Sequence, residues 1–277
     1  MVDDAMTRTH LHARVGTTVL ALMLTLLAAC SQSSQDSPAV FAFGHVHGLG
    51  LNPATGDLWI ATHDGLVILD DGQARRVDQV PHDLMGFTVT GPDEFAASGH
   101  PATVDEVNPM GLVTTIDAGR TLRPVSLTGQ ADLHAIDVSG SRVVAYDSVS
   151  QSVLESNDAG RTFAPLADLT AIDVAIAADG SVLFTGADHT LRQVSDGRTR
   201  QIMAAPPLAF IDGDSTLAGI SPTGLVWASK DGQSWKGRGE LPGQPQALSA
   251  SDGRWFAATT DGIFESTDDG ATWEALL

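Results

Sequence analysis

The sequence has one cysteine, one tyrosine and few basic side chains, and each shortage excludes something. A lone cysteine, Cys30, cannot form a disulfide within the chain. Only 15 Lys and Arg accompany 34 Asp and Glu in 277 residues, which gives a formal net charge of −19. A surface this acidic repels phosphate backbones, so we expect no nucleic-acid partner. The content of 43% hydrophobic residues is enough for a core and excludes a disordered chain.

Long apolar runs are also missing, apart from one uncharged stretch over residues 15–29. It follows a basic start and is shorter than the roughly 20 residues of a membrane-spanning helix, as in an export signal. It ends in LAAC (27–30), which resembles the lipobox of bacterial lipoproteins, with Cys30 as the lipid-bearing residue. We therefore predict a lipoprotein signal peptide over 1–29, then the lipidated cysteine and a flexible polar tether over 30–40. An ordinary secretory signal with a chance cysteine is the alternative.

A lipid at this position would make the membrane the first partner of the protein. One acyl chain gives only marginal anchoring, and bacterial lipoproteins typically carry several. The signal region holds as many acidic as basic residues, so its removal leaves the net charge at −19. The expected location is the cell envelope, on the outer side of the cytoplasmic membrane or in the periplasm. We expect a monomer.

A repeated pattern, S/T-x-D-x-G-x-T followed by an aromatic residue or Leu, determines the fold prediction. The copies are TIDAGRTL (115–122), SNDAGRTF (156–163), STDDGATW (266–273) and the shortened SKDGQSW (229–235). This is the Asp-box pattern of a tight β-turn, in which the carboxylate accepts backbone N–H bonds and the glycine adopts positive φ. Its aspartates are therefore predicted to be structural. They are Asp117, Asp158, Asp231 and Asp268.

The spacing of these turns divides the mature chain into six units that each suit a four-stranded propeller blade. The units are 45–80, 81–129, 130–169, 170–207, 208–241 and 242–277. We predict an all-β fold with one β-propeller domain over 41–277, six blades, and the Asp boxes between the third and fourth strands. Seven blades are the alternative, if residues 38–44 pair with the last blade or if two units were merged.

The seven histidines of the mature chain all align to one face of this propeller. In the innermost strands, one equivalent position holds His47, Met85, His134 and Asp173, and two residues earlier stand His45, Asp83 and Asp132. Near the connection of the second and third strands stand His63, His100, His189 and Tyr146. The Asp boxes align to the opposite face. Each histidine taken singly suits a hydrogen-bonded turn or strand end, but the group indicates a binding site.

Imidazole is the commonest metal ligand in proteins, and a thioether adds preference for a soft ion such as Cu(I). The candidate metal or ligand residues are His45, His47, His63, Met85, His100, His134 and Asp173. Copper and zinc are the candidate metals. Carboxylates around the mouth, from Asp83, Asp132 and Asp173, would add negative potential that favours cations. The spacing contains no HxxxH or CxxC pair, so it does not by itself specify coordination.

Several motifs resemble one family of bacterial lipoproteins. They are HVHGLGLNP (45–53), ATHDGL (61–66), DLMGFTV (83–89), ASGHP (97–101), MGLVTTIDAGRTL (110–122) and ADLHAIDVS (131–139). This family carries the label "glycosylhydrolase", and also the names exo-alpha-sialidase and BNR/Asp-box repeat protein. More remotely the chain is similar to sialidases, sortilin-type receptors and photosystem-assembly factors. The resemblance implies a propeller and an extracytoplasmic role, but a fold does not by itself carry a function.

Two alternatives to a metal or small-ligand site follow from this resemblance. A glycoside hydrolase needs paired carboxylates, and the candidate catalytic residues are Asp83 and Asp132, with Tyr146 as the only possible sialidase-type nucleophile. The arginine triad of sialidases is not recognisable, since Arg120 and Arg161 stand inside Asp boxes. A protein-binding scaffold of the envelope is the other alternative. The corresponding partners are a glycan or an envelope protein.

Overall fold

Short apolar segments alternate with glycine-containing turns after His45, and these segments form β-strands. The computed structural model describes residues 43–195, 198–213, 215–251 and 253–277. This part of the chain contains 24 strands and no helix. Accordingly, no helix within it is long and apolar enough to cross a membrane. The signal peptide and tether predicted over 1–40 fall outside the described residues.

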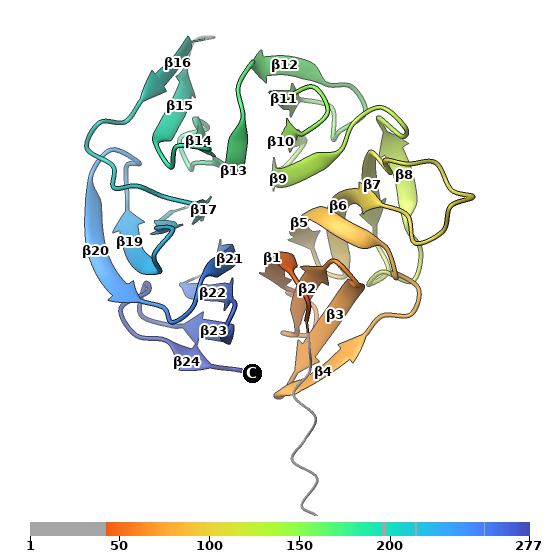
Figure 1. Cartoon of the computed structure of the whole chain (residues 1–277), viewed down its shortest axis with the longest axis horizontal. Coiled ribbons are helices and arrows are strands. Elements are labelled where there is room, and N and C mark those ends of the chain that lie inside the picture. The colour runs from red at the N-terminus through yellow and green to blue at the C-terminus, as the bar shows by residue number, and fades with distance from the viewer. Residues whose placement is uncertain (1–42, 196–197, 214, 252) are drawn as a thin grey trace, which may run out of the picture. The chain divides into compact units, whose positions relative to one another are not determined.

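Six sheets of four antiparallel strands follow one another along the chain and form a ring (Figure 1). Blade 1 comprises β1 (Val46–Leu51), β2 (Leu58–Thr62), β3 (Gly65–Asp70) and β4 (Gln73–Arg76). Blade 2 comprises β5 (Asp83–Gly91), β6 (Glu94–His100), β7 (Leu112–Thr115) and β8 (Arg123–Ser126). Blade 3 comprises β9 (Leu133–Ser139), β10 (Arg142–Asp147), β11 (Ser152–Ser156) and β12 (Ala164–Ala167).

The second half of the ring repeats this order. Blade 4 comprises β13 (Ala171–Ile176), β14 (Val182–Gly186), β15 (Leu191–Ser195) and β16 (Arg198–Gln201). Blade 5 comprises β17 (Phe210–Asp212), β18 (Leu217–Ile220), β19 (Leu225–Ser229) and β20 (Trp235–Glu240). Blade 6 comprises β21 (Pro245–Ser251), β22 (Arg254–Thr259), β23 (Gly262–Ser266) and β24 (Glu274–Ala275). The predicted all-β, six-bladed propeller is confirmed, and the seven-bladed alternative is wrong, because the described residues form six sheets.

Each blade is one continuous stretch of chain, so the ring closes between blades 1 and 6 without an exchanged strand. Side chains from both blades form one buried cluster, in which Leu49 and Ile60 pack with Phe256 and Ile263. The backbone N–H of Val46 also donates to the side chain of Gln246 across this boundary (3.2 Å). Burying each such large side chain contributes roughly 1.5–3 kcal/mol, so apolar packing is what joins the two ends of the ring.

The aspartates of the repeated pattern hold the turns between the third and fourth strands. In blade 3, the Asp158 carboxylate accepts bonds from the Thr162 N–H (2.9 Å), the Thr162 hydroxyl (2.7 Å) and the Ser156 hydroxyl (2.8 Å). These bonds lower the pKa of Asp158 to about 2. Corresponding bonds are made by Asp117, Asp268 and, with a different set of donors, Asp231. These carboxylates are occupied within their own turns, which is a structural use.

Candidate functional site

The topology of the blades places the site residues on one face. In an antiparallel order 1-2-3-4, the start of the first strand and the connection between strands two and three share a face, and the Asp-box turns lie on the opposite one. The starts of β1, β5 and β9 and the ends of β2 and β6 therefore meet on the same face. These five points carry the histidines and aspartates of blades 1 to 3.

Five of the six innermost strands begin with a β-bulge, and the bulge residue is the equivalent position in each blade. The bulge residues are His47, Met85, His134, Ile172 and Gln246. A bulge leaves one residue out of the ladder and re-aims its side chain. Asp173 does not share this position with His47, Met85 and His134, because it pairs with Thr185 one residue further along.

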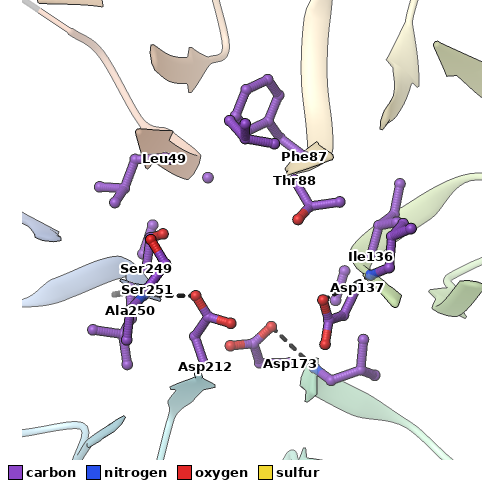
Figure 2. A pocket seen from close by; sticks show the side chains of 18 of the residues that line it. Leu49, Phe87, Thr88, Ile136, Asp137, Asp173, Asp212, Ser249, Ala250 and Ser251 are labelled. Carbon is purple, nitrogen blue, oxygen red and sulfur yellow. Dashed lines mark hydrogen bonds between the residues drawn. The ribbon is translucent and has the colours of Figure 1, made fainter. Parts of the chain in front are cut away.

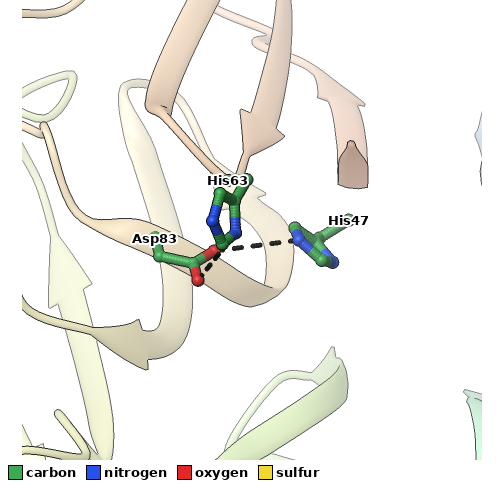
Figure 3. Close-up of side chains that lie close together, drawn as sticks. All are labelled: His47, His63 and Asp83. Carbon is green, nitrogen blue, oxygen red and sulfur yellow. Dashed lines mark ion pairs between the residues drawn. The ribbon is translucent and has the colours of Figure 1, made fainter. Parts of the chain in front are cut away.

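At the boundary of blades 1 and 2, two histidines meet one aspartate (Figure 3). His63 Nδ1 lies 2.9 Å from Asp83 Oδ2, and His47 Nε2 lies 3.7 Å from Asp83 Oδ1. Among the described residues, these three form the one group whose His, Cys, Asp or Glu ligand atoms all lie within 4.8 Å of one another. His47 Nε2 and Asp83 Oδ1 are both buried without a hydrogen-bond partner. A buried polar atom without a partner costs about 1–3 kcal/mol, which a bound cation would offset.

His47 is poised to remain neutral. Its side chain is only 13% exposed, and burial, together with the neighbouring charges of His45, His63 and His134, lowers its pKa from 6.5 to about 4. The His45 and His47 rings lie 4.6 Å apart. A neutral imidazole keeps the lone pair that a metal ion requires, so no proton has to be displaced from His47 at neutral pH.

A second cluster lies at the boundary of blades 2 and 3. His134 Nε2 lies 2.7 Å from Asp132 Oδ2, and His100 Nε2 lies 3.7 Å from the same oxygen. The Ser148 hydroxyl donates to this oxygen as well (2.9 Å). Burial alone would raise the pKa of Asp132, but the bonds from His134 and Ser148 and the charges of His134 and His100 lower it. His100 is held from its other side by Asn108, whose Oδ1 lies 2.7 Å from Nδ1.

The two clusters are joined through blade 2. Asp83 and His100 are direct cross-strand partners in the ladder of β5 and β6. Asp83 contacts His63 of blade 1, and His100 contacts Asp132 of blade 3. In the neighbouring blades, too, the residue after the second strand lies opposite the residue before the first strand. The His63 N–H donates to the His45 carbonyl (3.1 Å) in blade 1, and the Ser148 N–H donates to the Asp132 carbonyl (2.9 Å) in blade 3. The arrangement is thus one arc over three blades.

Other candidate residues lie apart from these clusters. Tyr146 is 6% exposed and packs with Val144 and Phe184, so its hydroxyl is poorly placed to act as a nucleophile on a sugar. His82 Nδ1 accepts a hydrogen bond from the Ala102 N–H (3.2 Å), which is a turn contact. His134 pairs with Asp132, and among His, Cys, Asp and Glu of the described residues the group of close ligand atoms is His47, His63 and Asp83, without His134.

A cavity of about 410 Å³ runs along the innermost strands of all six blades. Three carboxylates point into it and toward one another, from Asp137, Asp173 and Asp212 (Figure 2). Each accepts a backbone N–H from the next blade: Asp137 from Ile176 (2.6 Å), Asp173 from Ile211 (2.9 Å) and Asp212 from Ala250 (2.7 Å). These bonds tie blades 3, 4, 5 and 6 together at the axis.

Burial in this channel raises the pKa of all three carboxylates. For Asp212 the pKa rises to about 7, first because of burial and then because of the negative charge of Asp137. The pKa values of Asp173 and Asp137 are raised mainly by burial as well. Sequence reasoning missed Asp137 and Asp212. The signal that could have found them is an Ile-Asp pair that recurs in three otherwise apolar inner strands.

Comparisons with known proteins identify the architecture. No protein-family profile matches the sequence, and no curated protein matches it. A gluconolactonase from Xanthomonas campestris is similar in structure, with a TM-score of 0.64 and 14% identity over 80% of this chain and 85% of the other. Virginiamycin B lyase from Staphylococcus aureus gives 0.56 and 12% over 84% of both chains. A GH74 enzyme from Niastella koreensis gives 0.57 and 12% over 83% of this chain and 53% of its own.

At 12–14% identity, these likenesses show the fold alone. The chain is a β-propeller like these proteins, and its chemistry has to be argued from its own residues.

Proposed function

We propose that this protein binds a transition-metal ion at the mouth of the propeller through His47, His63 and Asp83. The observation that carries the proposal is the convergence of their three ligand atoms within 4.8 Å of one another. Two imidazoles and a carboxylate are donors that suit Zn²⁺ and Cu²⁺ rather than Mg²⁺ or Ca²⁺, which prefer oxygen ligands alone.

The distances between the donors support a tetrahedral ion. Zn²⁺ lies about 2.0–2.1 Å from N and O ligands, so ligands of a regular tetrahedron lie about 3.3 Å apart. The separations of 2.9 Å from His63 Nδ1 to Asp83 Oδ2 and of 3.7 Å from His47 Nε2 to Asp83 Oδ1 lie on either side of this value, so an ion between the imidazoles would lie beside both carboxylate oxygens. Three protein ligands leave a fourth position for water or for a small ligand, as in catalytic rather than structural zinc sites. His63 is 65% exposed, so the site is open to solvent on that side.

The proposal also fits the net charge of the protein and its expected location in the cell envelope. A net charge of −19 raises the local concentration of cations and disfavours anionic sugars.

We propose that a lipid on Cys30 holds the propeller at the outer side of the cytoplasmic membrane. Radiolabelled fatty acid should enter the wild-type chain and not Cys30→Ala when each is expressed in bacteria, and equal labelling would refute the anchor.

Metal titration tests the proposed site. Protein made without a His-tag and stripped of metal is titrated with Zn²⁺ by calorimetry, and with Cu⁺ in competition with a chromophoric chelator. His63→Ala should weaken binding at least tenfold, because the exposed His63 supplies a ligand without supporting the core. His82→Ala is the matched control and should bind like wild type, since His82 makes only a turn contact. Wild-type protein that binds neither ion would refute the proposal.

A glycosidase is less well supported by the same residues. Asp83 and Asp132, the candidate acid and base, each have an oxygen within 3 Å of an imidazole, so both carboxylates are already engaged by histidines. Tyr146 is buried in a cluster of apolar side chains rather than open to a sugar.

A further inference from the structure

We propose that the mouth holds a second metal position, formed by His100, Asp132 and His134, in which the contact of His100 with Asp132 repeats that of His63 with Asp83. The third ligand differs, because Met85 takes the position of His47 in blade 2 and His134 comes from blade 3. The inference rests on the proposed function, because it assumes that His/Asp clusters of this kind bind ions here. It extends that function from one ion per chain to two.

The repeat supplies the first argument. His63 ends the second strand of blade 1 and contacts Asp83 at the start of blade 2. His100 ends the second strand of blade 2 and contacts Asp132, which directly precedes the first strand of blade 3. The two His–Asp contacts are thus the same blade-to-blade contact, made once at each of two successive boundaries.

The distances supply the second argument. Around Asp83, the two histidine nitrogens lie 2.9 and 3.7 Å from the carboxylate. Around Asp132, they lie 2.7 and 3.7 Å away. The distances from imidazole to carboxylate at both positions lie on either side of the separation of about 3.3 Å between ligands of a tetrahedral Zn²⁺ ion. Only the first three residues have all their ligand atoms within 4.8 Å of one another, so at the second position His100, which is 38% exposed, must rotate toward His134 to complete the set.

An unpaired oxygen supplies the third argument. The Asp132 side chain is nine-tenths buried, and its Oδ1 has no hydrogen-bond partner. Asp83 Oδ1 is in the same condition at the first position. A buried carboxylate oxygen without a partner is costly, and a cation that Asp132 binds through Oδ1, beside the Oδ2 that His100 and His134 contact, would satisfy it.

The two positions differ in one respect that predicts their order of filling. Asp132 Oδ2 already accepts bonds from the Ser148 hydroxyl and, through Nε2, from His134. An ion at this position must replace the contact of His134 Nε2 with Asp132 Oδ2, whereas His47 Nε2 has no hydrogen bond to lose. The second position should therefore bind more weakly.

Zn²⁺ stoichiometry tests the inference. Equilibrium dialysis followed by elemental analysis should give two ions per wild-type chain and two for His82→Ala. His63→Ala and His100→Ala should each retain one ion, and the double variant should retain none. His134→Gln provides a second test of the weaker position, and far-UV circular dichroism verifies that each variant is folded.

The outcomes separate the two proposals. One ion that is lost in His63→Ala and retained in His100→Ala and His134→Gln would overturn the second position and leave the first intact. One ion lost in all these variants would mean a single shared site and would also overturn the inference. Wild-type protein without any bound ion would overturn both.

Discussion

The three channel carboxylates make a quantitative prediction about pH. Asp212 has an ordinary pKa of 3.8 in the unfolded chain and about 7 in the folded protein. Because the folded pKa is raised, the contribution of Asp212 to stability is fully present below pH 4 and is lost as the pH rises through 7. At about 1.4 kcal/mol per tenfold change, the loss amounts to at most about 4 kcal/mol, and water in the channel reduces it.

Asp212→Asn should remove this pH dependence. The amide oxygen can still accept the Ala250 N–H, but the amide NH₂ cannot accept the further hydrogen bonds that the carboxylate receives from the Gly213 N–H and the Ser249 side chain. That costs about 1 kcal/mol at every pH. At pH 4.5 wild type has already lost about 1 kcal/mol, so we expect the variant to be about as stable as wild type there and more stable at pH 8, by about 2–3 kcal/mol.

Guanidinium unfolding of metal-free protein at a series of pH values measures this difference. Asp105→Asn is the matched control, because it removes one carboxylate from an exposed loop far along the chain from the channel. Its stability relative to wild type should change little between pH 4.5 and 8. If the difference between Asp212→Asn and wild type also stays within about 1 kcal/mol over this range, the raised pKa of Asp212 is refuted.

Three further predictions concern other parts of the propeller. His47 has a pKa lowered to about 4 in the folded protein, so its contribution to folding stability is present above pH 6.5 and is lost as the pH falls toward 4. In unfolding experiments over this pH range, metal-free His47→Gln should lose less stability than wild type, by up to about 3 kcal/mol. Phe256→Ala should lower the unfolding free energy by about 3–5 kcal/mol, because the side chain fills the closure between blades 1 and 6; a change below 1 kcal/mol would contradict that packing. Ser98→Ala should cost about 1–3 kcal/mol, because it leaves the buried Leu133 N–H without its acceptor, and Ser98→Thr should restore part of the loss.

The sequence was sufficient to predict the fold because its repeats mark fixed points of each blade. An Asp box can form only where a tight turn joins two strands, so Asp117, Asp158 and Asp268 locate the turns between third and fourth strands. The intervening apolar segments then have few ways to pair. Blade number and order follow from that spacing.

The site could be predicted only as a face and a set of residues. A bulge adds one residue to a strand without a fixed sequence signature, and one extra residue moves every later side chain to the other face. Asp173 was aligned with His47 for that reason, although Ile172 takes the bulge in blade 4. Contacts between blades, such as His63 with Asp83, also depend on the angle between sheets, which no single-blade pattern contains.

Strand β9 connects the mouth with the channel. It carries His134 at its bulge, in contact with Asp132 at the boundary with blade 2, and Asp137 three residues further in, bonded to Ile176 in blade 4. An ion bound by His134 would therefore act on the same strand that carries Asp137 into the channel. The pKa of Asp212 is raised to about 7, first by burial and then by the charge of Asp137, so the protonation of the channel should change near neutral pH. Measuring Zn²⁺ affinity of Asp212→Asn against wild type from pH 6 to 8 would show whether the strand couples the two, since uncoupled sites give parallel curves.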